Sequence, residues 1–146
     1  MIELDRTKIT INLKALLSNL KYASALAPGK KIMSVIKADG YGHGAVKVAK
    51  TLRASNSFAV ARLEEAEDLR SAGLRSPVCV LEGVFSEQDL TRARELGLQL
   101  MVHSPHQINL YKKNGSNLPI WLKIDSGMGR LGFSIHQFSE VLKSLN

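Results

Sequence analysis

The 146-residue sequence contains a single cysteine, Cys79, so no disulfide can form within the chain. This cysteine lies in the apolar run "SPVCVLE", which we interpret as a buried strand that holds an unreactive thiol. No run approaches the ~20 apolar residues that a membrane-spanning helix needs. The opening "MIELDRTKITINL" lacks the apolar centre of a signal peptide. These absences predict a cytoplasmic protein with no membrane partner.

Acidic residues are the minority among the charged ones, with 13 Asp and Glu against 20 Lys and Arg and a net charge of +7. A basic excess occurs in proteins that bind nucleic acid or small anionic ligands. Here the basic residues are scattered along the expected helices, which is typical of solvated helix faces. We therefore predict no nucleic-acid partner; a nucleic-acid role would predict a steep dependence of binding on salt.

Short apolar runs alternate with amphipathic helical patterns along the whole chain. The runs expected as strands are 8–13, 31–37, 57–61, 76–83, 98–103 and 118–125. The segments expected as helices are 13–27, 44–55, 63–73, 86–97, 104–113 and 134–146. Nearly continuous apolar strands indicate a parallel sheet buried on both faces. The pattern predicts an α/β fold with five core strands, either an open doubly wound sheet or about the first half of a (β/α)8 barrel.

The first candidate site is "VIKADGYGHG", residues 35–44. Lys37 is expected as the last residue of a strand, at the end of the sheet where α/β active sites lie. Three glycines, Gly40, Gly42 and Gly44, would let backbone N–H groups and the next helix N-terminus approach an anion. A partly desolvated lysine is nucleophilic and forms Schiff bases with carbonyls, which favours pyridoxal 5'-phosphate (PLP). The alternative is an exposed lysine followed by an ordinary turn.

The second candidate site is "WLKIDSGMGRLGF", residues 121–133. Lys123 and Asp125 alternate with apolar residues on the expected strand, so both should point to one face. A lysine facing the interior of a barrel needs an anionic partner. Arg130 follows in a glycine-rich loop, where its guanidinium can grip a carboxylate or phenolate. The alternative is that Lys123 and Asp125 only pair with each other.

Two further patterns compete for the interpretation. Gly127, Gly129 and Gly132 spell G-x-G-x-x-G, which makes a nucleotide-binding oxidoreductase an alternative. Against it, the motif follows the fifth strand rather than the first and contains a bulky methionine and an arginine. The pair His103 and His106 has a spacing seen in metal sites, but no nearby Cys or carboxylate supports it, and we predict no metal.

The two candidate stretches resemble sequence motifs of a known protein family. "VIKADGYGHG" strongly resembles the PLP-attachment signature of bacterial alanine racemases, and "LKIDSGMGRLGF" looks like their second active-site segment. The opening "TKITINLKALLSNLKYASAL" is similar to the family's N-terminus. The resemblance implies a (β/α)8 TIM-barrel type of fold with about the first five βα units present. We therefore expect 1–146 to be the N-terminal part of a PLP-binding barrel domain, without the family's C-terminal β-domain.

The resemblance also implies roles for individual residues. Lys37 would carry PLP and act as a base on the D-alanine side of the substrate, and Tyr41 would contact the cofactor phosphate. Arg130 would bind the phenolic oxygen of PLP and help receive the substrate carboxylate, beside Met128. Lys123 matches a lysine that is carbamylated, as N6-carboxylysine, in many family members, and its added carboxylate would orient Arg130.

The activity implied is an isomerase that interconverts L-alanine and D-alanine through a PLP external aldimine and supplies D-alanine for peptidoglycan in the cell wall. Family members are homodimers in which the partner subunit supplies an opposing tyrosine base. That tyrosine and the later barrel strands have no counterpart here, so we expect a truncated N-terminal fragment that is inactive alone. The alternative within this resemblance is a non-catalytic PLP carrier or regulatory half-barrel.

Overall fold

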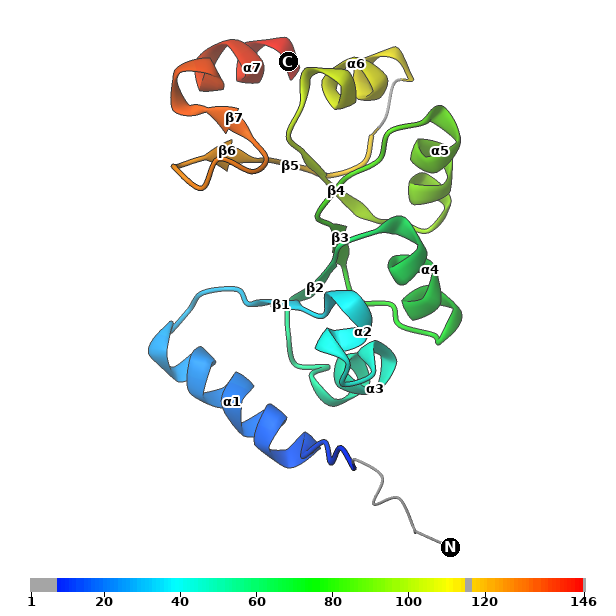
Figure 1. Ribbon diagram of the computed structural model, residues 1–146, viewed down its shortest axis with the longest axis vertical. Coiled ribbons are helices and arrows are strands. Elements are labelled where there is room, and N and C mark those ends of the chain that lie inside the picture. Colours follow the sequence, from blue (N-terminus) through cyan, green and yellow to red (C-terminus); the bar gives the residue numbers. More distant parts are fainter. Residues whose placement is uncertain (1–7, 115–116, 146) are drawn as a thin grey trace, which may run out of the picture.

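The computed structural model describes residues 8–114 and 117–145, and its centre is a five-stranded parallel sheet (Figure 1). The strands follow one another in sequence order across the sheet. They are β1 (Met33–Val35), β2 (Ser57–Val60), β3 (Val78–Val80), β4 (Gln99–Val102) and β5 (Ile120–Leu122). This order is that of a barrel wall, because a doubly wound sheet reverses its strand order at a switch point. The predicted α/β fold with five core strands is confirmed.

Helices precede and follow the strands, and α3 to α6 lie along one side of the sheet in Figure 1. Their bounds are α1 (Leu13–Leu26), α2 (Lys37–Tyr41), α3 (Ala45–Thr51), α4 (Leu63–Ser71), α5 (Glu87–Glu95), α6 (Pro105–Lys113) and α7 (Phe138–Leu145). The starts of two helices follow from local chemistry. The Ser86 hydroxyl accepts the Asp89 N–H at α5, and Ser104 accepts the Gln107 N–H at α6. None of the described helices is long and apolar enough to cross a membrane.

The two faces of the sheet differ because side chains alternate along each strand. Phe58 and Val60 on β2, with Val78 and Val80 on β3, belong to the main hydrophobic core, which also includes residues of α3, α4 and α5. Between them lies Cys79, paired in register with Ala59 and therefore on the second face. On that face the edge strands carry Val35 and Trp121, whose side chains are 42% and 48% exposed.

The predicted strand at 8–13 is wrong. Residues 8–12 form neither strand nor helix, and Leu13 already begins α1. Alternating β-branched residues favour a strand only where a neighbour supplies the second half of the hydrogen-bond ladder, and no strand among the described residues pairs with this segment. The Asn12 side chain instead accepts the Ala15 N–H and caps the helix. Ile9 is left 78% exposed.

The other predicted strands are all longer than the strands observed, and two of these differences bear on the candidate sites. The run 31–37 yields only Met33–Val35, so Lys37 is not a strand residue but the first residue of α2. The run 118–125 is divided into β5 and the two-residue β6 (Ile124–Asp125), with Lys123 between them. In both runs the apolar pattern continues past the point where the backbone leaves the main sheet.

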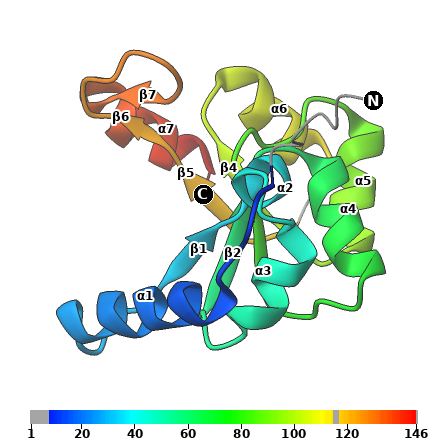
Figure 2. The ribbon, with the colours of Figure 1, turned by 60° about the horizontal axis from the view of Figure 1, so that its bottom comes forward.

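After Asp125 the chain forms a small second sheet rather than passing directly into a helix. β6 pairs in parallel with β7 (Phe133–Ser134). A 3₁₀ turn, η1 (Ile135–Gln137), then leads into α7. The helix expected over 134–146 therefore begins later, and its last residue lies outside the described residues. Figure 2 shows this unit and α2 at the same end of the main sheet, the carboxyl end of its parallel strands.

Candidate active site

Lys37 lies just beyond β1, at the carboxyl end of the sheet. Ile36 continues the ladder, its N–H donating to the Ala59 carbonyl at 2.8 Å, and the Ile36 side chain is buried. The Lys37 side chain is half-buried, and no acidic group among the described residues forms an ion pair with it. An amine without an acidic partner is available to react with a carbonyl compound.

The segment after Lys37 is a tight left-handed turn. Ala38, Asp39 and Tyr41 have φ of 52°, 51° and 55°, a region that L-residues other than Gly, Asn and Asp rarely enter. Gly40 lies between them with φ 64°, and a Cβ there would come within 3.2 Å of the Ala45 nitrogen. The Asp39 carboxylate accepts the Ala45 N–H at 2.7 Å, which ties the turn to the start of α3.

The expectation that the three glycines present free N–H groups is wrong in this conformation, because these groups donate within the turn itself. Those of Gly40, Gly42 and Gly44 donate to the carbonyls of Ile36, Ala38 and Asp39 at 2.8 to 2.9 Å. The N–H of Ala45, the first residue of α3, donates to the Asp39 carboxylate. Tyr41, in the same turn, is 58% exposed.

Lys123 occupies the break between β5 and β6, and its backbone is hydrogen-bonded to two further strands, β4 and β7. Its N–H donates to the Val102 carbonyl on β4, and its carbonyl accepts the Phe133 N–H on β7, both at 2.9 Å. Its side chain is half-buried, and its positive charge acts against burial on the pKa of the Cys79 thiol. Burial dominates and raises the pKa of Cys79 to about 11, as expected for an unreactive thiol.

Asp125 organises the loop that carries Met128 and Arg130. Its carboxylate accepts the N–H groups of Gly127 at 2.9 Å and Gly129 at 2.9 Å. These backbone hydrogen bonds hold the pKa of the Asp125 carboxyl below its usual range. Asp125 therefore does not pair with Lys123, and that alternative is wrong for the described residues.

The nucleotide-binding alternative is also wrong. In the dinucleotide fingerprint the glycine loop passes from a strand into a helix and presents its N–H groups to a pyrophosphate. Here two of these N–H groups are taken by the negatively charged Asp125, and the third glycine leads into β7. A Cβ on Gly132 would lie 2.8 Å from the Asp125 nitrogen, so this glycine serves the close approach of two backbone segments.

The two candidate segments lie at the same end of the sheet but at its opposite edges, after β1 and after β5. Within residues 8–114 and 117–145, no hydrogen bond or ion pair joins the Lys37 turn to the loop that carries Arg130. Arg130 and Met128 are exposed, the latter by 77%. Lys37 and Arg130 thus lie at the same end of the sheet, and neither forms an ion pair with an acidic group of the described residues.

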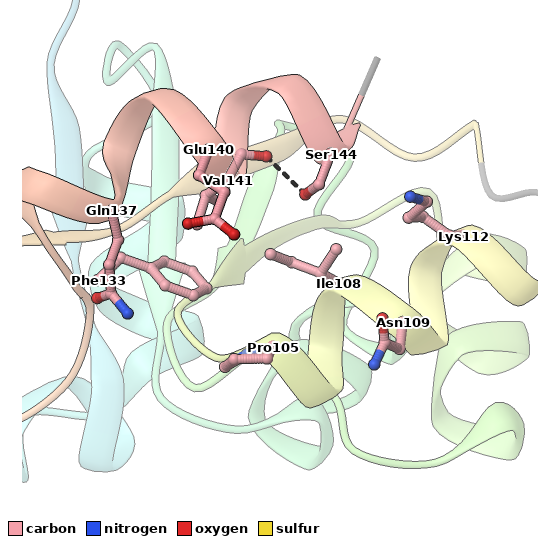
Figure 3. A pocket seen from close by; sticks show the side chains of 9 residues that line it. All are labelled: Pro105, Ile108, Asn109, Lys112, Phe133, Gln137, Glu140, Val141 and Ser144. Atoms are coloured by element: carbon pink, nitrogen blue, oxygen red, sulfur yellow. Dashed lines mark hydrogen bonds between the residues drawn. The ribbon is translucent and has the colours of Figure 1, made fainter.

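A hollow of about 220 Å³ between α6 and α7 is not part of this site (Figure 3). Ile108, Phe133 and Val141 form its apolar wall, with Lys112 and Glu140 at its rim. Neither Lys37 nor Arg130 lines it. Its volume is below the ~300–1,000 Å³ of usual small-molecule pockets.

The two histidines act in a loop contact. The Nε2 atoms of His103 and His106 lie 3.0 Å from the carbonyls of Glu82 and Phe85, which links the loops after β3 and β4. Groups of three or more His, Cys, Asp or Glu arranged to hold a metal are absent from the described part of the chain.

Sequence reasoning missed Glu65, the third residue of α4. Its carboxylate accepts the N–H groups of Ala61 and Arg62 at its own helix start, and that of Ala38 beside Lys37. A glutamate three residues after a helix N-cap commonly caps the helix, so its contacts with the N–H groups of Ala61 and Arg62 could have been predicted from the sequence. The contact with Ala38 could not, because it joins segments 27 residues apart.

Comparison with known proteins gives one consistent result. Residues 11–146 match the family model "Alanine racemase, N-terminal domain". The chain is 43% identical over 144 residues to an alanine racemase of Coxiella burnetii (strain CbuG_Q212), covering 97% of this chain and 40% of that protein. It is 45% identical over 137 residues to an alanine racemase of Shewanella sediminis, covering 92% of this chain and 38% of that protein. The chain thus spans about two fifths of the length of these curated relatives.

Solved structures agree. The structure of alanine racemase from Acinetobacter baumannii superposes with a TM-score of 0.87 at 38% identity, over 92% of this chain and 42% of that one. The biosynthetic alanine racemase from Pseudomonas aeruginosa gives a TM-score of 0.82 at 36% identity, over 88% of this chain and 37% of that one.

Proposed function

We propose that this chain, which belongs to the alanine racemase N-terminal domain family, forms the PLP-attachment part of an enzyme that interconverts L-alanine and D-alanine. The observation that carries the proposal is Lys37: a half-buried amine without an acidic partner among the described residues, at the carboxyl end of the first strand of a barrel wall. In this proposal residues 1–146 are the N-terminal part of the barrel domain. The D-alanine formed serves peptidoglycan synthesis, and the working enzyme is a homodimer.

The side chains at this end of the sheet fit PLP. The cofactor presents an aldehyde, a phenolate and a phosphate, and the site offers an amine on Lys37, a guanidinium on Arg130 and a phenol on Tyr41. Neither cation forms an ion pair among the described residues, so neither has to be released from an acid before it binds. Because the N–H groups of the Lys37 turn are used internally, we assign the phosphate contact of this segment to the Tyr41 hydroxyl.

The chemistry divides between cofactor and chain. PLP, when bound, withdraws electrons from the Cα–H bond of an attached amino acid and so makes its proton removable. Lys37 Nζ removes or returns that proton on the D-alanine side of Cα, as a general base and acid. Arg130 receives the substrate carboxylate, with Met128 beside it. The half-buried Lys37 stem limits the freedom of its amine and keeps it near this position.

Lys123 has a separate role in this proposal. Its neutral amine adds to carbon dioxide: the new N–C bond gives a carbamate on Nζ, and one proton is released to solvent. The new carboxylate provides the anionic partner that an inward lysine needs and orients Arg130. The support is its half-buried position without a carboxylate partner among the described residues. Incubation with ¹³C-bicarbonate should give a carbamate carbon signal that is absent in Lys123→Ala.

The attachment site is tested by mixing the chain with PLP, reducing with borohydride and mapping the labelled lysine. We expect one dominant label, on Lys37, at PLP concentrations that leave the exposed Lys47 of α3 mostly unlabelled. The control variant Lys37→Arg keeps the charge and should lose that label alone. Label distributed evenly over surface lysines, or unchanged in Lys37→Arg, would remove the assignment.

A PLP carrier without chemistry is distinguished by isotope exchange. With PLP bound, the chain is incubated with D-alanine and with L-alanine in D₂O, and deuterium at Cα is measured. A site with Lys37 as its base exchanges the Cα proton of D-alanine faster than that of L-alanine and loses this exchange in Lys37→Arg. Labelling at Lys37 with no exchange from either enantiomer would favour the carrier.

A further inference from the structure

We propose that Glu65 is a positioning residue for Lys37: its carboxylate clamps the left-handed turn that follows Lys37 to the end of β2 and the start of α4. The inference rests on the proposed function of Lys37 and adds a residue from α4 to that site. The clamp itself is a property of the chain without cofactor, and it can be tested separately.

One carboxylate joins three donors from two segments of the chain. Glu65 Oε1 accepts the Ala38 N–H at 2.5 Å, just after β1. Glu65 Oε2 accepts the N–H groups of Ala61 at 2.7 Å and Arg62 at 3.0 Å, just after β2. A helix cap needs only the contacts on its own helix. The hydrogen bond to Ala38 is not part of the cap. It joins the left-handed turn that follows Lys37 to α4.

The turn that follows Lys37 requires such a fastening, because three of its non-glycine residues have left-handed φ angles. Backbone in this region persists only where surrounding contacts hold it. The turn is held at both ends by carboxylates, Glu65 at the Ala38 N–H and Asp39 at the Ala45 N–H. Removal of either bond favours a return of the turn to ordinary backbone angles.

Lys37 lies between two fixed points. On one side Ile36 is buried, and its N–H is in the sheet ladder. On the other side the Ala38 N–H is held by Glu65. Fixing the backbone on both sides sets the direction of the Lys37 Cα–Cβ bond and hence the space that its amine can reach. Glu65 forms no ion pair with Lys37, so this effect needs no neutralisation of the amine.

The test uses Glu65→Gln, which keeps the shape of the side chain but removes the charge and one of the two acceptor oxygens. Glu64→Gln is the matched control: it makes the same charge change one residue away, on an exposed side chain whose ion pair with Arg62 is 3.6 Å long. The first measurement is amide hydrogen exchange of the 146-residue chain by NMR, without PLP. The second is borohydride trapping of PLP at Lys37 against surface lysines.

We expect Glu65→Gln to speed exchange of the Ala38 amide by about 10- to 100-fold, the range for loss of a hydrogen bond to a charged group. Trapping at Lys37 should fall about tenfold or more relative to surface lysines. Glu64→Gln should leave both unchanged. Protection of the Val80 amide in β3 reports whether the fold persists. If it is lost in Glu65→Gln, Glu65→Asp is measured instead, with an intermediate increase expected at Ala38.

The outcomes separate the two proposals. Trapping at Lys37 in the wild type with no change in Glu65→Gln, and no change in Ala38 exchange, overturns the role of Glu65 and leaves the attachment site standing. Absence of trapping at Lys37 in the wild type overturns the attachment site, and Ala38 exchange in the two variants still decides whether Glu65 clamps the turn. If Glu64→Gln and Glu65→Gln change Ala38 exchange and Lys37 trapping equally, the cause is a general effect of charge, and the clamp proposal is overturned.

Discussion

Replacing Gly132 by alanine should destabilise the chain by about 2–6 kcal/mol. Gly132 has a φ of +123°, and a Cβ there would come within 2.8 Å of the Asp125 nitrogen and 3.1 Å of the Lys123 carbonyl oxygen. These are backbone atoms, so no side chain can rotate away. The new methyl group has to push the end of the Arg130 loop away from the backbone of Lys123 and β6.

Two separable effects make up this magnitude. A non-glycine residue at such a φ costs about 1–3 kcal/mol of backbone strain. Forcing a methyl group into a filled space costs a further ~1–3 kcal/mol. Gly127 isolates the first effect, because its φ of +133° is similar and a Cβ there meets nothing within 4 Å. The unfolding free energy of Gly127→Ala should therefore fall only by the cost of the backbone strain.

The assay is urea unfolding of the wild type, Gly127→Ala and Gly132→Ala, followed by circular dichroism. With a slope of about 2 kcal/mol per M, the steric effect should separate the two variant midpoints by roughly 0.5–1.5 M. Gly132→Ala should also shift the NMR signals of Lys123 and Asp125 more than Gly127→Ala does. Coincident midpoints for the two variants would refute the close approach at Gly132.

Three further outcomes are expected. Backbone donors lower the folded-state pKa of the Asp125 carboxyl. The contribution of this carboxylate to the unfolding free energy is therefore fully present above the unfolded pKa of about 3.9 and is lost as the pH falls through the lower folded pKa. The unfolding free energies of wild type and Asp125→Asn, measured with urea, should differ at pH 6 and converge at strongly acid pH, and a difference that grows on acidification would contradict this. With the pKa of Cys79 at about 11, roughly one thiol in 1,000 is ionised at pH 8; a thiol reagent should modify the native chain at least ~100-fold more slowly than the urea-unfolded chain, and equal rates would place the thiol at the surface. Ser86→Ala removes the acceptor of the Asp89 N–H at the start of α5 and should lower the unfolding free energy by about 1 kcal/mol; Ser86→Asn should restore most of that loss if capping is the cause.

Local chemistry was enough to place much of the chain from its sequence. Serine side chains that can accept a helix N–H mark the starts of α5 and α6, whatever the rest of the chain does. Short β-rich apolar runs between amphipathic helices indicate buried parallel strands, because only such strands need apolar residues on both faces. The "KADGYGHG" and "GMGRLG" stretches mark the two candidate site segments, because their residue types are unusual enough to be recognised without coordinates.

Tertiary structure decided where those segments act. The pattern of 8–13 favours a strand, yet no strand in the described part of the chain pairs with it, and a strand exists only through its partner. The glycines after Lys37 indicated free N–H groups, yet folding paired three of them with carbonyls of the same turn. The contact of Glu65 with Ala38 depends on α4 lying beside the end of β1. Spacing along the chain carries no record of such contacts, because they depend on which elements the folded sheet brings side by side.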